Sequence, residues 1–124
     1  MHPDILNLFA PTPGGLALYA ALEAAILQRF PGVENRPRRT QVGFFHGCGF
    51  AWASPARRKR DRDAGRILLS FGLPAPVESP RILQAIEPYP GRWTHHLLLS
   101  SPADLDDALM AWLEEAHRFA AFRA

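Results

Sequence analysis

Two adjacent histidines, His95 and His96, stand in the apolar run "RWTHHLLLS" of this 124-residue chain. Neighbouring side chains of a β-strand point to opposite faces of the sheet, so the two imidazoles lie in different environments. One face carries His95 with Trp93, Leu97 and Leu99, and the other carries His96 with Thr94, Leu98 and Ser100. The more apolar face predicts His95 to be a core histidine with a ring nitrogen bonded to the backbone. His96 is the candidate for proton transfer or ligand contact, because imidazole titrates near neutral pH.

Three other side chains suit an anion held beside His96. Arg92 stands just before the same strand, and a guanidinium binds carboxylate or phosphate through paired hydrogen bonds. We expect Gln41, Trp52, Arg92 and His96 to line a cleft for an anionic ligand or an acidic protein partner. The alternative is a small enzyme in which His96 is the acid or base and Arg92 holds an anionic substrate.

A basic cluster in "PARRKRDRDAGR" supports a third hypothesis, nucleic-acid binding. Its cations are Arg57, Arg58, Lys59, Arg60 and Arg62. Such a cluster can follow a phosphate backbone, and interleaved aromatic residues can stack on single-stranded bases. The other interpretation is a solvated loop whose charge is diluted by two aspartates.

Cys48 is the only cysteine, so the chain cannot form an internal disulfide. His46 and Cys48, together with one of the tandem histidines, would give three nitrogen or sulfur ligands for zinc. The glycines of "HGCG" equally suit a turn, and we expect neither a metal nor a cofactor. A nucleophilic Cys48 paired with a histidine has no further support in the sequence.

The composition is that of a globular protein, with 48% hydrophobic and 21% charged residues. No apolar run reaches the roughly 20 residues that span a bilayer, and the N-terminus lacks the features of a secretory signal, so we expect a cytoplasmic protein. Residues 34–66 hold nine Arg or Lys and three acids, whereas residues 101–124 hold two Arg and five acids. This separation can create a local field for an anion. Apolar residues near the C-terminus also leave homodimerisation open.

Local patterns predict the elements that position these residues. An Ala- and Leu-rich run predicts a helix over 14–30, and two aromatic runs around "HGCG" predict a hairpin over 40–54. Residues 55–66 are predicted to be an exposed basic loop. The apolar run 67–72 predicts a central strand covered on both faces.

The remaining segments alternate in the same way. Ser79 and Pro80 predict the start of a short helix over 79–86, followed by a strand over 93–100. Ser101, Pro102 and Asp104 predict the start of a C-terminal helix over 102–121. We therefore expect a single α+β domain over 1–124, in which an antiparallel sheet of about four strands packs against N- and C-terminal helices in two layers.

Four short blocks carry a resemblance to a known family. They are Thr40–Gln41, Phe50–Ala51–Trp52, Ser79–Pro80 and Trp93–Thr94–His95–His96. With them the chain resembles a bacterial and archaeal family known as domain of unknown function 5655, over roughly Leu16 to Phe122. The resemblance implies a compact α+β fold and no assigned activity.

Overall fold

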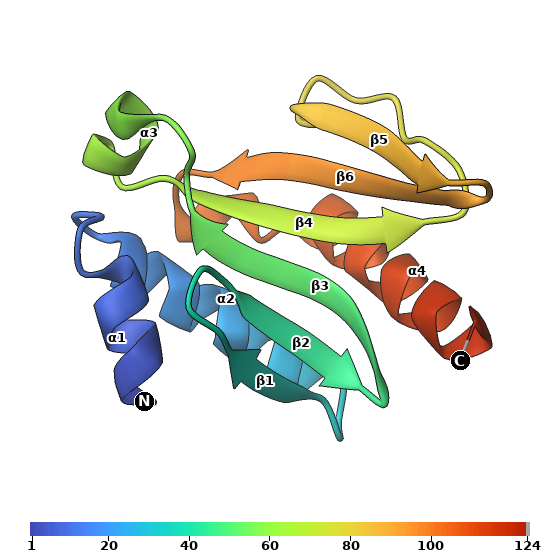
Figure 1. The fold of residues 1–124 in the computed structure, drawn as a ribbon, viewed down its shortest axis with the longest axis horizontal. Helices are drawn as coiled ribbons and strands as arrows, with labels where there is room; N and C mark the ends of the chain where they lie inside the picture. Colours follow the sequence, from blue (N-terminus) through green and yellow to red (C-terminus); the bar gives the residue numbers. More distant parts are fainter. Residues whose placement is uncertain (124) are drawn as a thin grey trace.

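Six antiparallel strands form one sheet in a computed structural model of the chain, which describes residues 1–123. The strands are β1 (Glu34–Pro37), β2 (Val42–His46), β3 (Cys48–Pro55), β4 (Ile67–Leu73), β5 (Gln84–Tyr89) and β6 (Arg92–Leu99). Their order across the sheet is β1-β2-β3-β4-β6-β5 (Figure 1). The helices are α1 (Pro3–Phe9), α2 (Gly15–Arg29), α3 (Lys59–Asp63) and α4 (Asp107–Arg123). The predicted α+β class is confirmed, but the expected number of about four strands is wrong.

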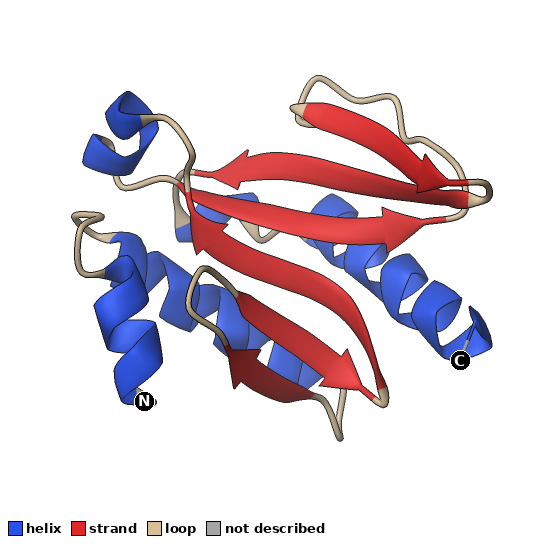
Figure 2. Cartoon of the chain, in the orientation of Figure 1, coloured by secondary structure: helices blue, strands red, loops and turns tan. Residues whose placement is uncertain are grey.

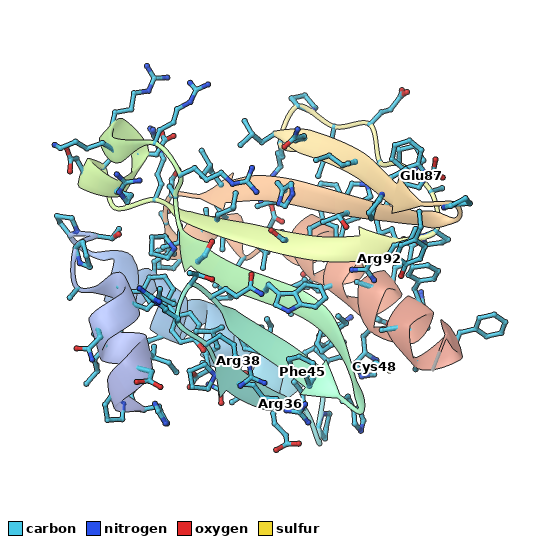
Figure 3. All side chains as sticks on the ribbon, in the orientation of Figure 1. Arg36, Arg38, Phe45, Cys48, Glu87 and Arg92 are labelled. Atoms are coloured by element: carbon cyan, nitrogen blue, oxygen red, sulfur yellow. The ribbon has the colours of Figure 1, made fainter. Side chains whose placement is uncertain are left out.

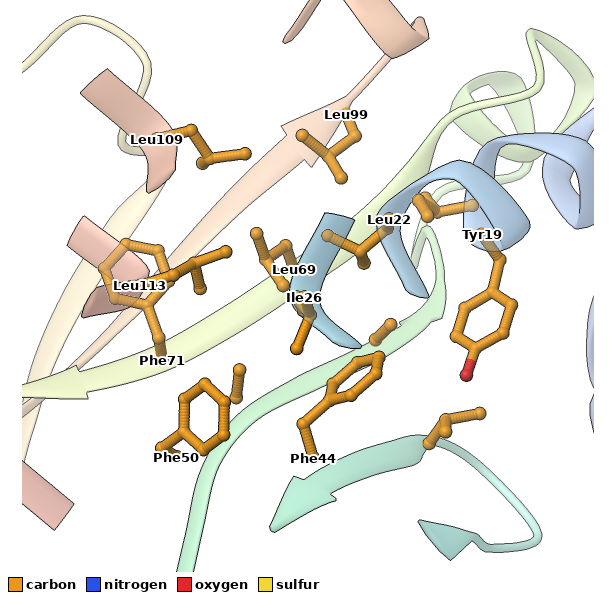
Figure 4. Packing of buried hydrophobic residues seen from close by; sticks show 14 of the residues in the cluster. Tyr19, Leu22, Ile26, Phe44, Phe50, Leu69, Phe71, Leu99, Leu109 and Leu113 are labelled. Carbon is orange, nitrogen blue, oxygen red and sulfur yellow. The ribbon is translucent and has the colours of Figure 1, made fainter. Parts of the chain in front are cut away.

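The long helices α2 and α4 lie side by side behind one face of the sheet, as Figure 2 shows. Helix α4 packs against β3 and β4, and α2 packs against β4. Buried residues of both layers interdigitate between them (Figure 4), including Tyr19, Leu22, Ile26, Phe44, Phe50, Leu69, Phe71, Leu99, Leu109 and Leu113. No described helix packs on the opposite face of the central strands, which we call the outer face.

Strand β4 is central, as its apolar run predicts, but helices cover only one of its faces. Its outer-face residues are Leu68, Ser70 and Gly72, and Leu68 is only 5% exposed. Leu68 lines a hollow with Arg57 and Leu83, so the segments that follow β3 and precede β5 lie around it on this face. The predicted central strand is confirmed and six of its seven residues are buried, but helices supply the expected cover on one face only.

The predicted short helix over 79–86 is absent, and β5 occupies its second half. The N–H of Arg81 is 3.3 Å from Ser79 Oγ, so the expected capping contact forms for a single turn. The chain then leaves the helical path, because the N–H of Leu83 donates to the carbonyl of His96 at 2.8 Å. Pairing with β6 replaces helical hydrogen bonds, and Pro88 is tolerated because β5 is an edge strand.

The predicted basic loop over 55–66 contains the short helix α3 and one buried charge. Asp61 is only 8% exposed, and Arg66 Nη1 lies 2.7 Å from its Oδ1. This ion pair offsets the cost of burying the carboxylate. The expectation that the whole segment is an exposed loop is thus wrong.

The C-terminal helix begins later than the predicted residue 102. Ser101 and Asp104 form the predicted capping box, but it starts only a 3-10 helix over Pro102–Asp104. The carboxylate of Asp106 then accepts from the N–H of Leu109 at 3.0 Å, and α4 runs from Asp107 to Arg123, past the predicted end at 121. Two capping signals stand in succession, and the second one starts the long helix.

Two short elements have no counterpart among the predicted ones. Helix α1 begins at Pro3 after a cap from His2, whose Nδ1 accepts from the N–H of Asp4. Strand β1 pairs with β2 at the edge of the sheet, although its sequence "ENRP" is polar and ends in proline. An edge strand needs partners on one side only, so local sequence gives little signal for it.

Candidate functional site

The outer face of the sheet is hollowed over strands β3, β4 and β6. The hollow has a volume of about 440 Å³ and is called the sheet-face pocket here. It is lined by Gln41, Trp52, Ser54, Arg57, Leu68, Ser70, Arg92, Thr94 and His96. All four residues of the predicted cleft, Gln41, Trp52, Arg92 and His96, therefore line one pocket.

Strand register brings these residues together from distant parts of the sequence. Trp52 of β3 pairs with Ser70 of β4, and Ser70 pairs with His96 of β6. Residues that pair directly across antiparallel strands point to the same face. These three side chains therefore form a row across the outer face.

Arg92 lies flat against the sheet beside a glycine. A Cβ atom on Gly72 would stand 2.8 Å from Arg92 Cζ, which is closer than real contacts allow. The Arg92 guanidinium also lies 5.7 Å from the ring centroid of Trp52, within reach of a cation–π interaction. Figure 3 shows Arg92 in front of the sheet beside the end of β4. The missing side chain at Gly72 is thus what lets Arg92 reach the pocket.

His96 is a half-buried imidazole with one defined partner. Its Nδ1 lies 2.7 Å from Ser70 Oγ, and the direction of this hydrogen bond follows the tautomer. Burial lowers the pKa of His96, and the positive charges of Arg57 and of a protonated His95 lower it further. The ring is therefore neutral near pH 7, when it can both donate and accept a hydrogen bond.

His95 is completely buried on the helix side, as its alternation with His96 predicts. The N–H of Val77 donates to its Nε2 at 2.9 Å, so its proton lies on Nδ1 and donates to the carbonyl of Trp93 at 3.1 Å. The ring stacks on Phe71 with a centroid distance of 5.4 Å. Burial lowers its pKa, although its backbone partners oppose this shift. The prediction of a core histidine bonded to the backbone is confirmed.

The basic cluster divides into cations bonded within the segment and cations that form no ion pair among the described residues. Lys59 Nζ lies 2.7 Å from Asp63, and Arg62 Nη1 donates to the backbone carbonyl of Ala56 at 2.9 Å. A second hollow of about 560 Å³, called the loop pocket here, is lined by Arg57, Arg58, Arg60, Asp61, Arg66, Leu68, Leu83, Gln84 and Leu98. Three of the five predicted nucleic-acid residues thus face one pocket, and the other two stabilise the loop.

His46 pairs with a residue that the zinc hypothesis does not include. Its Nδ1 lies 3.0 Å from Nε2 of His117 on α4, and His117 stacks on Phe30. His95 is enclosed in the core, and His96 lies on the outer face beside Ser70. Within residues 1–123, no group of three His, Cys, Asp or Glu side chains is placed to hold a metal ion.

Sequence reasoning missed two residues that shape the pocket. Ser70 and Gly72 stand in the strand "ILLSFGL", where they look like interruptions of an apolar run. A serine and a glycine at alternate positions of an apolar strand are the signal that its second face is not packed against another layer. This pattern therefore predicts that one face of β4 has no second layer packed on it.

The fold and the pocket can be compared with known proteins. Residues 13–120 match the family described as Domain of unknown function (DUF5655). The chain belongs to this family. The region shared with the family includes the whole sheet and every residue of both pockets, whereas α1 precedes it. No curated protein and no solved structure matches the chain. In the part of the chain that the structure describes, no helix is long and apolar enough to cross a membrane.

Proposed function

We propose that this protein is a small binding module that recognises an anionic ligand in the sheet-face pocket. The observation that carries the proposal is the charge of the lining: it contains Arg57 and Arg92 and no acidic residue. Among the described residues, neither guanidinium takes part in an ion pair. Two unpaired guanidinium groups in one hollow favour an anion, because each can supply charge-assisted hydrogen bonds.

The neutral lining residues suit the same kind of ligand. Gln41, Ser54 and Thr94 bring side chains that can donate hydrogen bonds, and neutral His96 adds another donor or acceptor. Trp52 provides an apolar wall beside Arg92. A pocket with a few polar groups around an apolar surface is the usual form of a small-molecule site.

Replacing Arg92 by alanine should weaken the binding of a small anion at least tenfold. The reason is that hydrogen bonds to a charged group contribute about 1.5–3 kcal/mol each. Binding of pyrophosphate and of citrate can be measured by isothermal titration calorimetry. Arg118→Ala, which removes the same charge from α4 behind the sheet, is the matched control. The proposal fails if the wild-type protein binds neither anion, or if both variants weaken binding equally.

One contact favours the second candidate function, a small enzyme. Ser70 Oγ and the neutral His96 ring lie in hydrogen-bond contact at 2.7 Å, which is the arrangement of a hydroxyl nucleophile and its base. Arg92 would hold the anionic substrate in this hypothesis.

The variant His96→Ala separates the binding module from the enzyme. For a binding module, we expect its affinity for pyrophosphate to stay within about tenfold of wild type, since a neutral ring adds one ordinary hydrogen bond of about 1 kcal/mol. An enzyme would show the same small change in affinity, but its turnover of an activated substrate such as p-nitrophenyl acetate or p-nitrophenyl phosphate would be lost. Wild-type turnover that disappears in both His96→Ala and Ser70→Ala would establish the enzyme and displace the simple binding module.

A cytoplasmic location and homodimerisation stay predictions. The exposed side chain of Phe122 near the end of α4 is the feature that supports a self-association surface.

A further inference from the structure

The sheet-face pocket continues into the loop pocket. Both are lined by Arg57 and Leu68, so the two hollows meet at these residues. The combined surface runs across the outer face of β3, β4 and β6 and reaches the start of β5 at Gln84. We infer that this groove binds single-stranded nucleic acid, an inference that rests on the proposed anion-binding function and names its class of ligand.

The charges of the groove suit a chain of phosphates better than one small anion. Its cations are Arg57, Arg58, Arg60, Arg66 and Arg92, and its one acid is Asp61. Asp61 is already paired with Arg66. The other four arginines form no ion pair among the described residues, and they extend from one hollow into the other. Separated cations along one groove match the repeated charges of a nucleic-acid backbone.

Two aromatic rings lie on the same outer face next to these charges. A Cβ atom on Gly43 would stand 2.5 Å from the Phe45 ring and 3.1 Å from the Trp52 ring, so both rings lie close over the bare backbone of β2. Both side chains are partly exposed. The guanidinium of Arg36 lies 4.3 Å from the ring centroid of Phe45, and that of Arg92 lies 5.7 Å from the ring centroid of Trp52. Aromatic and guanidinium planes of this kind are the surfaces on which unpaired bases stack.

The backbone of the sheet explains why the single-stranded form is favoured. Strands β3, β4 and β6 each have a neighbour on both sides, so their ladder groups are paired within the sheet. Because these groups are already paired, recognition depends on contacts with phosphates and on stacking. Stacking requires unpaired bases, and it distinguishes little between base sequences. A duplex hides its bases, and it is read by a helix or ribbon inserted in the major groove. Among residues 1–123, no helix or two-stranded ribbon stands on the outer face over β3, β4 and β6.

Fluorescence anisotropy with a labelled oligothymidylate of about a dozen nucleotides tests the inference. For single strands, the logarithm of the binding constant falls with the logarithm of the salt concentration by a slope of about 0.7 per phosphate contact. If four arginines each neutralise a phosphate, raising the salt from about 50 to about 200 mM should therefore weaken binding about fiftyfold. The duplex of the same length should bind at least tenfold more weakly at either salt. An oligouridylate of the same length shows whether DNA or RNA is preferred.

Two pairs of variants separate stacking from general charge. Trp52→Leu should weaken binding of the oligothymidylate about tenfold, whereas Trp52→Phe keeps a stacking ring and should stay close to wild type. Replacing both Arg58 and Arg60 by alanine should reduce the slope of the logarithm of the binding constant against the logarithm of the salt concentration by about 1.4. Removing Arg29 and Arg118 on the helix side changes the net charge equally and should leave the slope unchanged. Thermal unfolding shows whether each variant is folded.

The outcomes distinguish this inference from the anion-binding proposal. Binding of pyrophosphate that depends on Arg92, without preference for the single strand over the duplex, would overturn the inference and leave the proposal in place. Equal binding of the single strand and the duplex, unchanged in Trp52→Leu, would show that the protein binds by charge alone. This result would also overturn the inference. If the protein binds neither pyrophosphate nor the oligonucleotide, both the inference and the anion-binding proposal are wrong.

Discussion

Replacing Phe71 by alanine should lower the free energy of unfolding by about 3–5 kcal/mol, as expected for truncation of a fully buried phenylalanine. Phe71 is completely buried on the central strand β4. Its ring stacks on His95 and lies 6.3 Å from the ring of Trp112 on α4. The alanine variant therefore leaves a cavity between the sheet and the helix that the neighbouring rings cannot fill. A loss of this size is a large share of a typical total stability of about 5–15 kcal/mol.

Urea denaturation followed by circular dichroism measures this loss. The midpoint should fall while the slope stays the same, because the unfolded state is unaltered. Phe122→Ala is the matched control: its side chain is 92% exposed, and its truncation should change stability by less than about 0.5 kcal/mol. A Phe71→Ala variant within 1 kcal/mol of wild type would contradict the described packing of the core.

Replacing His95 by leucine should lower the free energy of unfolding by about 1–3 kcal/mol, even though leucine suits the apolar surroundings. The imidazole accepts from the N–H of Val77 and donates to the carbonyl of Trp93. Leucine removes both hydrogen bonds and leaves the Val77 N–H without its acceptor, which costs about 1–3 kcal/mol, whereas Trp93 is also paired with Leu73 in the sheet. His95→Gln, which retains a donor and an acceptor, should lose less. The same denaturation experiment compares the two, and equal stability of the leucine variant and wild type would refute this role.

The stability of the protein should fall in mild acid, and His95 should account for part of the fall. Burial places its folded-state pKa below the ordinary value of 6.5. At a pH below 6.5 the unfolded chain gains a proton on this residue that the folded chain does not bind. The contribution of His95 is therefore complete above pH 6.5 and is lost as the pH falls towards the folded-state pKa, at about 1.4 kcal/mol per pH unit.

His96 and His117 have pKa values lowered in the same direction, mainly by burial, and they add to this dependence. Denaturation at about pH 7.5 and about pH 5 should show wild type losing more stability than His95→Leu over the interval. If the two proteins lose the same amount, the pKa of His95 is the same in the folded and the unfolded chain, and burial does not lower it.

The proposed site is a consequence of how the layers are arranged. Helices α2 and α4 both cover one face of the sheet, so the outer face of β3, β4 and β6 is left to side chains alone. Small residues on that face, such as Ser70 and Gly72, give the longer side chains room to lie along it. An anion bound there would be held by rigid strands, which position side chains better than loops do.

Features that depend on neighbours along the chain can be predicted from the amino-acid sequence. The uninterrupted run of helix formers placed α2 almost to the residue, and Gly47 marked the turn between β2 and β3. Alternation along β6 assigned His95 to the core and His96 to the other face. The family assignment also follows from short blocks of sequence, over residues 13–120.

Which segments meet depends on the packing of the whole chain and cannot be predicted from local sequence. Ser79 and Pro80 are good helix-start residues, yet the following chain pairs with β6, because hydrogen bonds to a neighbouring strand outweigh a weak local preference. The contact between Ser70 and His96 joins residues 26 positions apart and depends on the register of β4 and β6. His46 meets His117 for the same reason, across 71 positions. Local sequence carries the periodicity of an element, whereas the register between elements is fixed by the packing of the whole core.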